Sequence, residues 1–569
     1  MKLFSKIIAV VAAASIALGC SPSIYAQSAA LAQDDFVHAD GTRIVGTDGK
    51  ELLIKGMAFG NNVWNNSNTP DLTHHTEEDY RRLAEMGFNC VRFYLNYNLF
   101  ENDSAPYSYH ESGFEWLDLN IQWAKKHGIG IIFNMHYPQG GYQSQGNGGL
   151  LWSDKNNQQR LAELWKAIAR RYANEPTVWG YGLVNEPTIS LSTTVQDAVS
   201  QCEMLMNMLA DEIRSVSPYQ AIFCEAGPAV ITADKGEWID TAAYYEHPLY
   251  FTLDDDNVIY EFHNYNPFHF THQAADWAGT DGISSHYPSR NIVSADYSSG
   301  WVDCISGSAM RSEHGWTYFE TQNIAPCNDY NIAYIALGCY NIGLHCSVYA
   351  DDLMLIETSP DGTETVLEHL TFDDSTGSLY PWSSNGTGRI EHVPLIGHDD
   401  NGCVRFGFAT ENFTASCSSK YEMRDGCTYK VTGWLKGENA DIRMDFAKAQ
   451  NIQTGNIDYL ESTILPYVHF SREHDVPIYL GEFGVIRAGF ENENGGVQWV
   501  SDMIDLCMRY NIGFNYHAYH EWSFGLYYDY GGILPTDQNM NKELAQLFKL
   551  KLKIAAPIHS VFRLLDIFR

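Results

Sequence analysis

The chain is 569 residues long, which exceeds the usual size of a single hydrophobic core, so two or three domains are expected. It carries 70 Asp and Glu residues against 36 Lys and Arg residues, for a net charge of −34. Such an acidic chain repels the phosphates of nucleic acids and anionic lipids, which argues against both as partners and favours neutral ligands such as sugars.

Residues 1–32 have the pattern of an export leader. Lys2 and Lys6 precede an apolar run that is too short to span a membrane comfortably, as in a cleaved signal peptide. The run ends in "ALGC", which resembles a bacterial lipoprotein signal with Cys20 as the lipid-bearing residue, whereas "ALA" at 30–32 offers an ordinary cleavage site. We therefore expect an exported protein, either a lipoprotein of the cell envelope, at the outer surface or in the periplasm, or a secreted protein.

Short apolar runs alternate with helical patterns in residues 33–307 and again in residues 448–569. Runs such as "CVRFYL", "IGIIFNMH" and "VWGYGLVNEP" predict six strands in the first part, and "PIYLGEFG" and "GFNYHAY" predict two in the second. Strands that alternate with helices form a parallel sheet. Eight of them predict an α/β fold, a closed (β/α)8 TIM barrel.

Residues 308–447 interrupt this alternation. They contain short alternating stretches such as "SVYADDLMLIE" and "TYKVTGWLKG", separated by Gly, Asn, Asp and Ser, which predict an antiparallel β-sandwich inserted after strand six. A barrel tolerates such an insertion when its two ends lie close together. Seven of the 12 cysteines fall between residues 304 and 427, which makes a disulfide or two plausible there in an exported protein.

Polar residues stand at the carboxyl ends of the predicted barrel strands, and these ends meet at one mouth of a barrel. They are, in chain order, Arg92, His136, Asn185, Glu186, Glu225, His263, Tyr265, Glu482 and His517. A retaining glycosidase needs two facing carboxylates roughly 5 to 5.5 Å apart, one as acid/base and the other as nucleophile. Glu186 on strand four and Glu482 on strand seven fit this requirement.

The remaining polar residues can support this pair. Arg92 would hold the nucleophile ionised, and the histidines and Tyr265 would orient sugar hydroxyls. Glu225 is the nearest rival carboxylate, and we interpret it as a residue that contacts substrate or supports Tyr265. Structural roles are the alternatives: Arg92 would bridge acidic loops, and His136 and His263 would be buried core histidines.

Five motifs on the predicted strands resemble glycoside hydrolase family five: "GFNCVRFYL", "IIFNMHYPQGG", "YGLVNEP", "YEFHNYNP" and "PIYLGEFG". The resemblance covers roughly residues 40–300 and 455–550. It implies that Glu186 is the acid/base and Glu482 the nucleophile. It also implies that Asn185 binds the sugar 2-hydroxyl, that Arg92 and Tyr265 contact the nucleophile, and that His136 and His263 line the same subsite. Many members carry a Trp on strand eight, whereas this strand has His517 there and Trp522 five residues later, so which of the two meets the sugar stays open.

The inserted segment has a resemblance of its own. "GWTYFE", "IAYIALGC" and "SVYADDLMLIE" are similar to the second half of a β-sandwich carbohydrate-binding module, and "GCVRFGFAT" and "GCTYKVTGWLKG" to its first half, in circularly permuted order. We therefore expect a retaining hydrolase of β-linked glycans, with an endo-β-1,4-glucanase of the cellulase kind as the first candidate. A β-mannanase, a xyloglucanase, a glycolipid glycosidase and a non-catalytic surface glycan-binding lipoprotein are the alternatives. No metal or organic cofactor is required.

Overall fold

The computed structural model describes most of the chain between residues 31 and 553. The parts outside the description are residues 1–30, 191–193, 233–237, 242–248, 281–282, 299–301, 307–314, 340–346, 374–381, 386–387, 400–401, 408–411, 418, 438, 529–531 and 554–569. The side chains of residues 302–306, 347 and 383–385 are outside it as well. The predicted leader, with Cys20, therefore lies almost entirely outside the described residues.

Eight parallel strands form a closed barrel and follow one another around it in chain order. They are β3 (Lys55–Phe59), β4 (Cys90–Asn96), β7 (Gly130–Tyr137), β8 (Val178–Gly182), β10 (Ala221–Glu225), β13 (Val258–His263), β28 (Ile478–Phe483) and β29 (Gly513–Tyr516). The last strand closes the barrel by pairing in parallel with the first. The predicted (β/α)8 barrel is confirmed.

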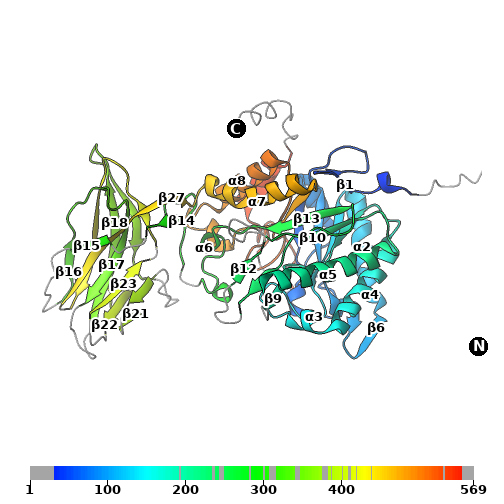
Figure 1. The fold of residues 1–569 in the computed structure, drawn as a ribbon, viewed down its shortest axis with the longest axis horizontal. Helices are drawn as coiled ribbons and strands as arrows, with labels where there is room; N and C mark the ends of the chain where they lie inside the picture. The colour runs from blue at the N-terminus through cyan, green and yellow to red at the C-terminus, as the bar shows by residue number, and fades with distance from the viewer. Residues whose placement is uncertain are drawn as a thin grey trace, which may run out of the picture.

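Helices surround the barrel on the right-hand side of Figure 1. The long ones are α1 (Glu77–Met86), α2 (Glu111–His127), α4 (Lys155–Tyr172), α5 (Val195–Arg214), α7 (Ile457–His474), α8 (Gly496–Tyr510) and α9 (Lys542–Lys551), and α3 (Gly149–Ser153) and α6 (Phe268–Thr271) are short. In α4, Leu161, Trp165 and Ile168 recur at helical spacing and are fully buried, which turns one face of the helix to the strands. The Asp154 side chain caps this helix by accepting a bond from the N–H of Asn156.

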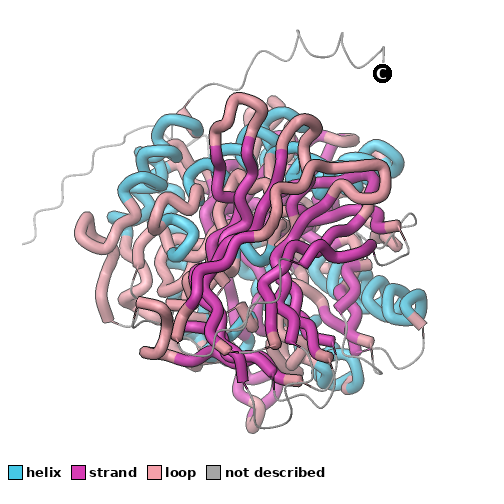
Figure 2. The backbone as a smooth tube through the Cα atoms, turned by 90° about the vertical axis from the view of Figure 1, so that its left-hand side faces the viewer, coloured by secondary structure: helices cyan, strands magenta, loops and turns pink. Residues whose placement is uncertain are grey.

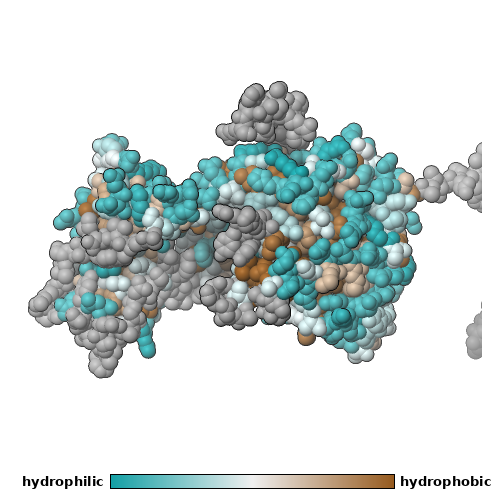
Figure 3. Space-filling view, in the orientation of Figure 1, coloured by the Kyte–Doolittle hydropathy of each residue, from teal (hydrophilic) through white to brown (hydrophobic). Residues whose placement is uncertain are grey.

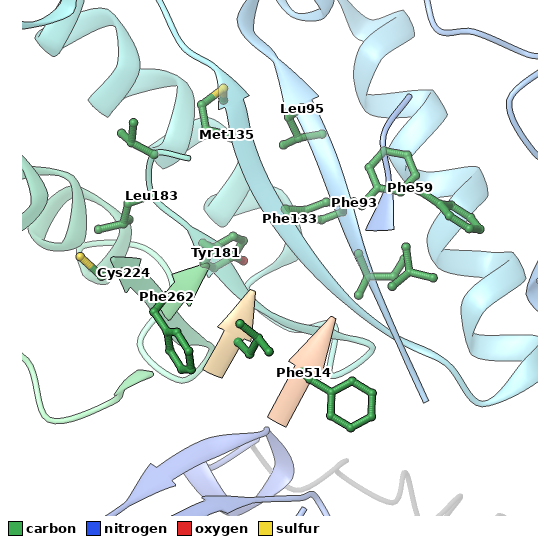
Figure 4. Close-up of a cluster of buried hydrophobic side chains, with 14 of the residues drawn as sticks. Phe59, Phe93, Leu95, Phe133, Met135, Tyr181, Leu183, Cys224, Phe262 and Phe514 are labelled. Atoms are coloured by element: carbon green, nitrogen blue, oxygen red, sulfur yellow. The ribbon is translucent and has the colours of Figure 1, made fainter. Parts of the chain in front are cut away.

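Alternation along the barrel strands decides which side chains reach the interior. In β4, Val91, Phe93 and Leu95 belong to the large core between strands and helices, as do the labelled Phe133 of β7 and Phe514 of β29 (Figure 4). Residues between them in sequence point to the opposite face of the sheet, which in a barrel is the interior. The second, smaller core, which includes Cys90 of the same strand, lies on that inner side. Polar residues that alternate with the outer core therefore converge inside the barrel.

Short strands elaborate the loops of the barrel. A three-stranded sheet consists of β9 (Thr188–Ser190), β11 (Ala229–Ile231) and β12 (Trp238–Asp240), and two hairpins consist of β1 (His38–Asp40) with β2 (Arg43–Val45) and β5 (Glu101–Asn102) with β6 (Ala105–Tyr109). The three-stranded sheet follows barrel strands four and five, because β9 continues from β8 and β11 from β10. It therefore adds structure directly beyond the carboxyl ends of these strands.

The chain leaves the barrel after β13 through β14 (Ile292–Tyr297) and returns through β27 (Ala449–Thr454). These two strands pair antiparallel, so the two ends of the insertion lie side by side. Between them, two antiparallel sheets form a sandwich at the left of Figure 1, which faces the viewer in Figure 2. The predicted insertion of a β-sandwich after strand six is confirmed.

Within the described part of the sandwich, each sheet has six strands. One contains β15 (Val302–Ser306), β26 (Ala440–Ala447), β17 (Ile332–Cys339), β23 (Phe413–Cys417), β20 (Trp382–Asn385) and β24 (Tyr421–Glu422). The other contains β16 (Thr317–Glu320), β25 (Thr428–Lys436), β18 (Ser347–Thr358), β22 (Cys403–Gly407), β21 (Arg389–Val393) and β19 (Glu364–Leu370). One of these strands, β15, precedes residue 308, where the predicted insertion begins. Inward-facing residues such as Ile335, Leu355 and Met444 form the core of the sandwich.

The nine cysteines for which the structure gives a state are free thiols, including Cys339, Cys403 and Cys417 in the sandwich, so none of these nine forms the disulfide considered for this region. Among the described residues, no helix has both the length and the apolar character needed to cross a membrane. Hydrophilic side chains cover much of the visible face of the barrel (Figure 3), as the high content of acidic residues predicts.

Candidate active site

The mouth of the barrel brings Glu186 and Glu482 together, although they are far apart in the sequence. Glu482 lies in β28, and Glu186 follows the end of β8. One carboxylate oxygen of each lies within 4.8 Å of the other and of a ring nitrogen of His263. Carboxyl groups roughly 5 to 5.5 Å apart suit attack by one and proton transfer by the other on the same bond, whereas a spacing of roughly 6.5 to 9.5 Å leaves room for water between them. The observed spacing is of the short kind.

Glu482 is almost fully buried and accepts three hydrogen bonds. Arg92 Nη1 donates at 2.8 Å and the Tyr94 hydroxyl at 2.6 Å to Oε1, and the Tyr265 hydroxyl donates at 3.0 Å to Oε2. Burial raises the pKa of Glu482, but the positive charges of His263 and Arg92 outweigh it and hold this pKa well below its usual range. Glu482 is therefore ionised at neutral pH, as a nucleophile must be.

Glu186 occupies a different environment. Its Oε1 lies 2.8 Å from Nδ1 of His263, and 29% of its side chain is exposed, which lets its carboxyl exchange a proton with solvent or a ligand. Its φ of 43° is in the left-handed region, which is uncommon for a residue other than glycine. Its backbone N–H donates to Oε1 of Glu225 at 2.5 Å. Glu225 thus contacts the backbone of Glu186, and its ε1 oxygen also lies 3.9 Å from Nε2 of His263.

His263 lies between the carboxyl groups of the site. Its Nε2 is 3.2 Å from Oε1 of Glu261, and its Nδ1 is 3.7 Å from Oε2 of Glu482 as well as close to Glu186. Burial lowers the pKa of His263, but the negative charge of Glu482 and the hydrogen bonds to Glu186 and Glu261 outweigh it and raise this pKa well above its usual value. His263 is therefore an imidazolium cation whose two N–H groups face different carboxyls, and not an isolated core histidine.

The guanidinium group of Arg92 contacts β28, β13 and the segment that follows β8. Besides its bond to Glu482, its Nη2 donates to Oδ1 of Asn185 at 2.9 Å and lies 2.6 Å from Oε1 of Glu261. Its side chain is fully buried, so these bonds are shielded from water. Asn185 in turn donates from Nδ2 to the Ser144 hydroxyl at 3.2 Å. Arg92 therefore contacts the carboxylate of β28 directly.

The other histidines of the site lie beside Tyr94. The His136 ring stacks on Tyr94 with 4.0 Å between centroids, and its Nδ1 is 3.9 Å from Oε1 of Glu482. Burial lowers the pKa of His136 well below its usual value, so it is neutral. His517 Nδ1 lies 3.0 Å from the Tyr94 hydroxyl, whereas Trp522, in the loop after β29, is 58% exposed. Of the two candidates on strand eight, His517 lies in the cluster around Glu482.

Sequence reasoning missed two members of this cluster, Tyr94 and Glu261. Tyr94 stands two residues after Arg92, and Glu261 stands two residues before His263. Side chains two positions apart on a strand point to the same face, so both had to accompany a residue already placed inside the barrel. This alternation was the signal that would have identified them.

A cavity of about 220 Å³ adjoins Glu186 on the side of β10 and β12. Its lining includes Glu225, Glu261 and His263, with Trp238 and Asp240 of β12. The ring of Trp238 is 51% exposed. Exposed aromatic faces and carboxylates are the groups that contact the C–H faces and hydroxyls of sugars. The cavity therefore offers room for a polar ligand next to Glu186.

Residues 45–325 match the profile of a family described as cellulase (glycosyl hydrolase family 5), a range that contains Glu186 and ends before Glu482. Endoglucanase C of Acetivibrio thermocellus is 29% identical over 206 residues, which are 36% of this chain and 54% of that protein. Cellodextrinase A of Ruminococcus flavefaciens is 27% identical over 206 residues, which are 35% of this chain and 54% of that protein. The chain thus spans about half the length of these curated relatives.

Solved structures are similar as well. The crystal structure of endoglucanase Cel5A from Thermotoga maritima aligns with a TM-score of 0.45 at 16% identity and covers 87% of this chain and 96% of that one.

Proposed function

The chain contains a glycoside hydrolase family 5 domain, and from this premise we propose that it is a retaining hydrolase that cleaves β-1,4-linked glucan chains at internal bonds. The observation that carries the proposal is the short spacing of Glu186 and Glu482, whose carboxylate oxygens lie within 4.8 Å of each other in unlike environments. One carboxyl is buried, ionised and held by three donors, and the other is partly exposed beside the imidazolium of His263. These are the requirements of a nucleophile and of an acid/base.

The reaction proceeds in two displacements. Glu482 attacks the anomeric carbon while the bond to the departing sugar breaks, and Glu186 gives its proton to the departing oxygen. Glu186 then takes a proton from water, the water oxygen attacks the anomeric carbon, and the bond to Glu482 breaks. The anomeric configuration is retained because it is inverted twice.

The neighbouring residues support these steps. Arg92, Tyr94 and Tyr265 stabilise the Glu482 carboxylate before attack and after release. Asn185, held by Arg92, is assigned to the sugar 2-hydroxyl, and His136 and His517 line the same subsite. We assign Trp522, which is exposed, to contact with a sugar unit of the glucan that lies further from the cleaved bond. A metal or organic cofactor is not required by this chemistry.

Alanine substitution of each glutamate tests the assignment. We expect Glu186→Ala to lower kcat/KM by roughly 10²- to 10⁴-fold on an unactivated glucan, because it loses its general acid. Glu482→Ala should lose the covalent step and the activity with it. Glu115→Ala, at an exposed position of α2, is the control and should match the parent. Equal release of reducing sugar from all four proteins would reject the mechanism and favour a non-catalytic glycan-binding protein.

Substrate preference needs a separate measurement. The names of the relatives, endoglucanase and cellodextrinase, concern glucan chains of different lengths and support a β-glucan substrate. We expect a rapid fall in viscosity of a soluble cellulose derivative, since internal cleavage shortens chains from the first turnover. Faster hydrolysis of β-mannan, xyloglucan, xylan or a glycolipid on the same panel would replace the cellulase assignment.

We also propose that the sandwich binds polysaccharide for the barrel. Its removal is straightforward because the N–H of Ser298 donates to the carbonyl of Lys448 at 2.9 Å, so a two-residue turn can join these positions. The deletion variant should keep its kcat/KM on soluble substrate and lose affinity for insoluble cellulose. Unchanged affinity in a folded, active deletion variant would remove this role from the sandwich.

Export and lipid attachment at Cys20 are the final part of the proposal. They rest on the charged start, the apolar run and the "ALGC" motif. Metabolic labelling with a fatty acid analogue should mark the parent and not Cys20→Ser. An unlabelled parent found in the culture medium would indicate ordinary secretion instead.

A further inference from the structure

We infer that Glu225 is a positioning residue that fixes the backbone of Glu186 and thereby aims the acid/base carboxyl at the departing oxygen. This inference rests on the proposed role of Glu186. Glu225 is the last residue of β10, and Glu186 follows the adjacent strand β8. The two strand ends are therefore neighbours at the barrel mouth.

The backbone of Glu186 needs support from its surroundings. A left-handed conformation at a residue other than glycine persists only where the surrounding structure holds it, and such residues gather at active sites. At Glu186, Oε1 of Glu225 accepts the backbone N–H at 2.5 Å, and the Thr188 hydroxyl donates to the backbone carbonyl at 2.9 Å. Both sides of this strained residue are thus held, one of them by the Glu225 carboxyl.

Burial and charge make Glu225 suitable for this task. Burial raises the pKa of Glu225 to about 8, the charge of Glu261 adds to the increase, and His263 and the hydrogen bond from the backbone N–H of Glu186 oppose it. A neutral carboxyl still accepts a hydrogen bond through its carbonyl oxygen. At neutral pH, Glu225 therefore holds the N–H of Glu186 and adds no negative charge beside the acid/base.

The charge count of the site agrees with this state. Arg92 and His263 supply two positive charges, and Glu482 and Glu261, which both contact Arg92, can balance them as carboxylates. Glu186 must carry a proton to act as an acid. A proton on Glu225 then leaves these six side chains without a net charge, which the burial of Arg92, Glu261 and Glu482 favours.

Three variants separate positioning from a merely structural role. Glu225→Ala removes the acceptor, Glu225→Met fills the space without accepting a bond, and Glu225→Gln keeps a neutral acceptor. Each is assayed on phenyl β-cellobioside, whose leaving group needs a proton, and on 2,4-dinitrophenyl β-cellobioside, whose leaving group departs without one. Thermal unfolding confirms that each variant is folded.

Positioning predicts a selective loss. Glu225→Ala and Glu225→Met should lower kcat on the phenyl substrate roughly 10- to 100-fold, and change attack on the dinitrophenyl substrate by about threefold or less. Glu225→Gln should stay close to the parent on both substrates. The matched control is Glu101→Ala, which removes another buried glutamate, bonded to Arg160 at 3.0 Å and to Gln139 at 2.8 Å. It should affect both substrates equally.

Two results would overturn the inference. Equal losses on the two substrates in a folded Glu225→Met or Glu225→Ala variant would mean that Glu225 only stabilises the fold, and unchanged activity would mean that Glu186 is fixed without it. If Glu225→Ala does not fold, Glu225→Met decides between these outcomes. A folded parent that is inactive on both cellobiosides and on the glycan panel rejects the proposed function itself, and with it this role of Glu225.

Discussion

The tyrosines bound to Glu482 allow the ionisation of this residue to be tested quantitatively. Tyr94→Phe removes the donor that lies 2.6 Å from Oε1 and leaves the ring in place. A hydrogen bond to a charged group contributes about 1.5 to 3 kcal/mol, and one pKa unit corresponds to about 1.4 kcal/mol. The pKa of Glu482 should therefore rise by about 1 to 2 units in this variant.

The sign of the effect on activity follows from the role of Glu482 as a carboxylate. Activity falls as pH drops through the pKa of Glu482, so a higher pKa moves the acid limb of the kcat/KM profile to higher pH. Tyr265→Phe should cause a smaller shift, because its bond to Oε2 is longer at 3.0 Å. The profile is measured on a soluble chromogenic cellobioside, and the double variant should shift further than either single variant.

A tyrosine outside the site provides the control. Tyr172 of α4 donates to Oδ1 of Asp118 at 2.9 Å, so Tyr172→Phe removes a similar bond to a carboxylate away from the barrel mouth. Its acid limb should coincide with that of the parent. Acid limbs that stay in place in both Tyr94→Phe and Tyr265→Phe, with the variants folded, would refute the view that these hydroxyls stabilise ionised Glu482.

Three further predictions concern the buried charges. Arg92→Met should lower the free energy of unfolding by about 3 to 5 kcal/mol, because it removes the guanidinium that pairs with the carboxylates of Glu482 and Glu261. A denaturant midpoint close to that of the parent would contradict this prediction. Gly481→Ala should lower kcat, because a β-carbon there would lie 1.7 Å from Oε1 of Glu261 and would displace a carboxylate that Arg92 binds. Unchanged kinetics would show that the Glu261 carboxylate can move without loss of activity. Glu225 holds a proton in the folded state up to a pKa of about 8 but loses it near pH 4.5 when unfolded, so the free energy of unfolding should fall as pH rises across this window, by at most about 1.4 kcal/mol per pH unit. Glu225→Gln should flatten that dependence in urea unfolding at several pH values.

The barrel was predictable because its signals are local. A strand such as "VWGYGLV" is apolar on both faces, which is typical of a parallel strand covered on both sides. Once eight such strands are counted, the polar residue at the carboxyl end of each strand is expected at the mouth of the barrel. Glu482 was assigned in this way even though a whole sandwich separates it from strand six. Tyr94 and Glu261 were missed because only one or two polar residues of each strand were considered, although strand alternation places Tyr94 on the same face as Arg92 and Glu261 on the same face as His263.

Other features depend on long-range geometry and leave no local pattern. The hydrogen bond from the Glu186 N–H to Glu225 joins residues 39 positions apart. It depends on a left-handed backbone conformation at Glu186, which the motif "NEP" does not predict. The charge of His263 depends on carboxyls from several strands. The pairing of β14 with β27 likewise joins segments on either side of the sandwich, so the composition of either segment does not reveal it.

The contacts of the site explain how two glutamates of the same chemistry take opposite roles. Glu482 binds Arg92, Arg92 binds Glu261, Glu261 faces His263, and His263 faces Glu186, with distances of 2.8, 2.6, 3.2 and 2.8 Å. Positive and negative groups alternate along this series, and its buried end receives the additional hydroxyl donors. Glu482 is therefore held ionised, while Glu186, at the exposed end, shares the His263 cation with other carboxyls. The difference that a double displacement requires is thus set by where each carboxyl stands in one connected network, so a substitution at Arg92 or Glu261 should disturb both roles together.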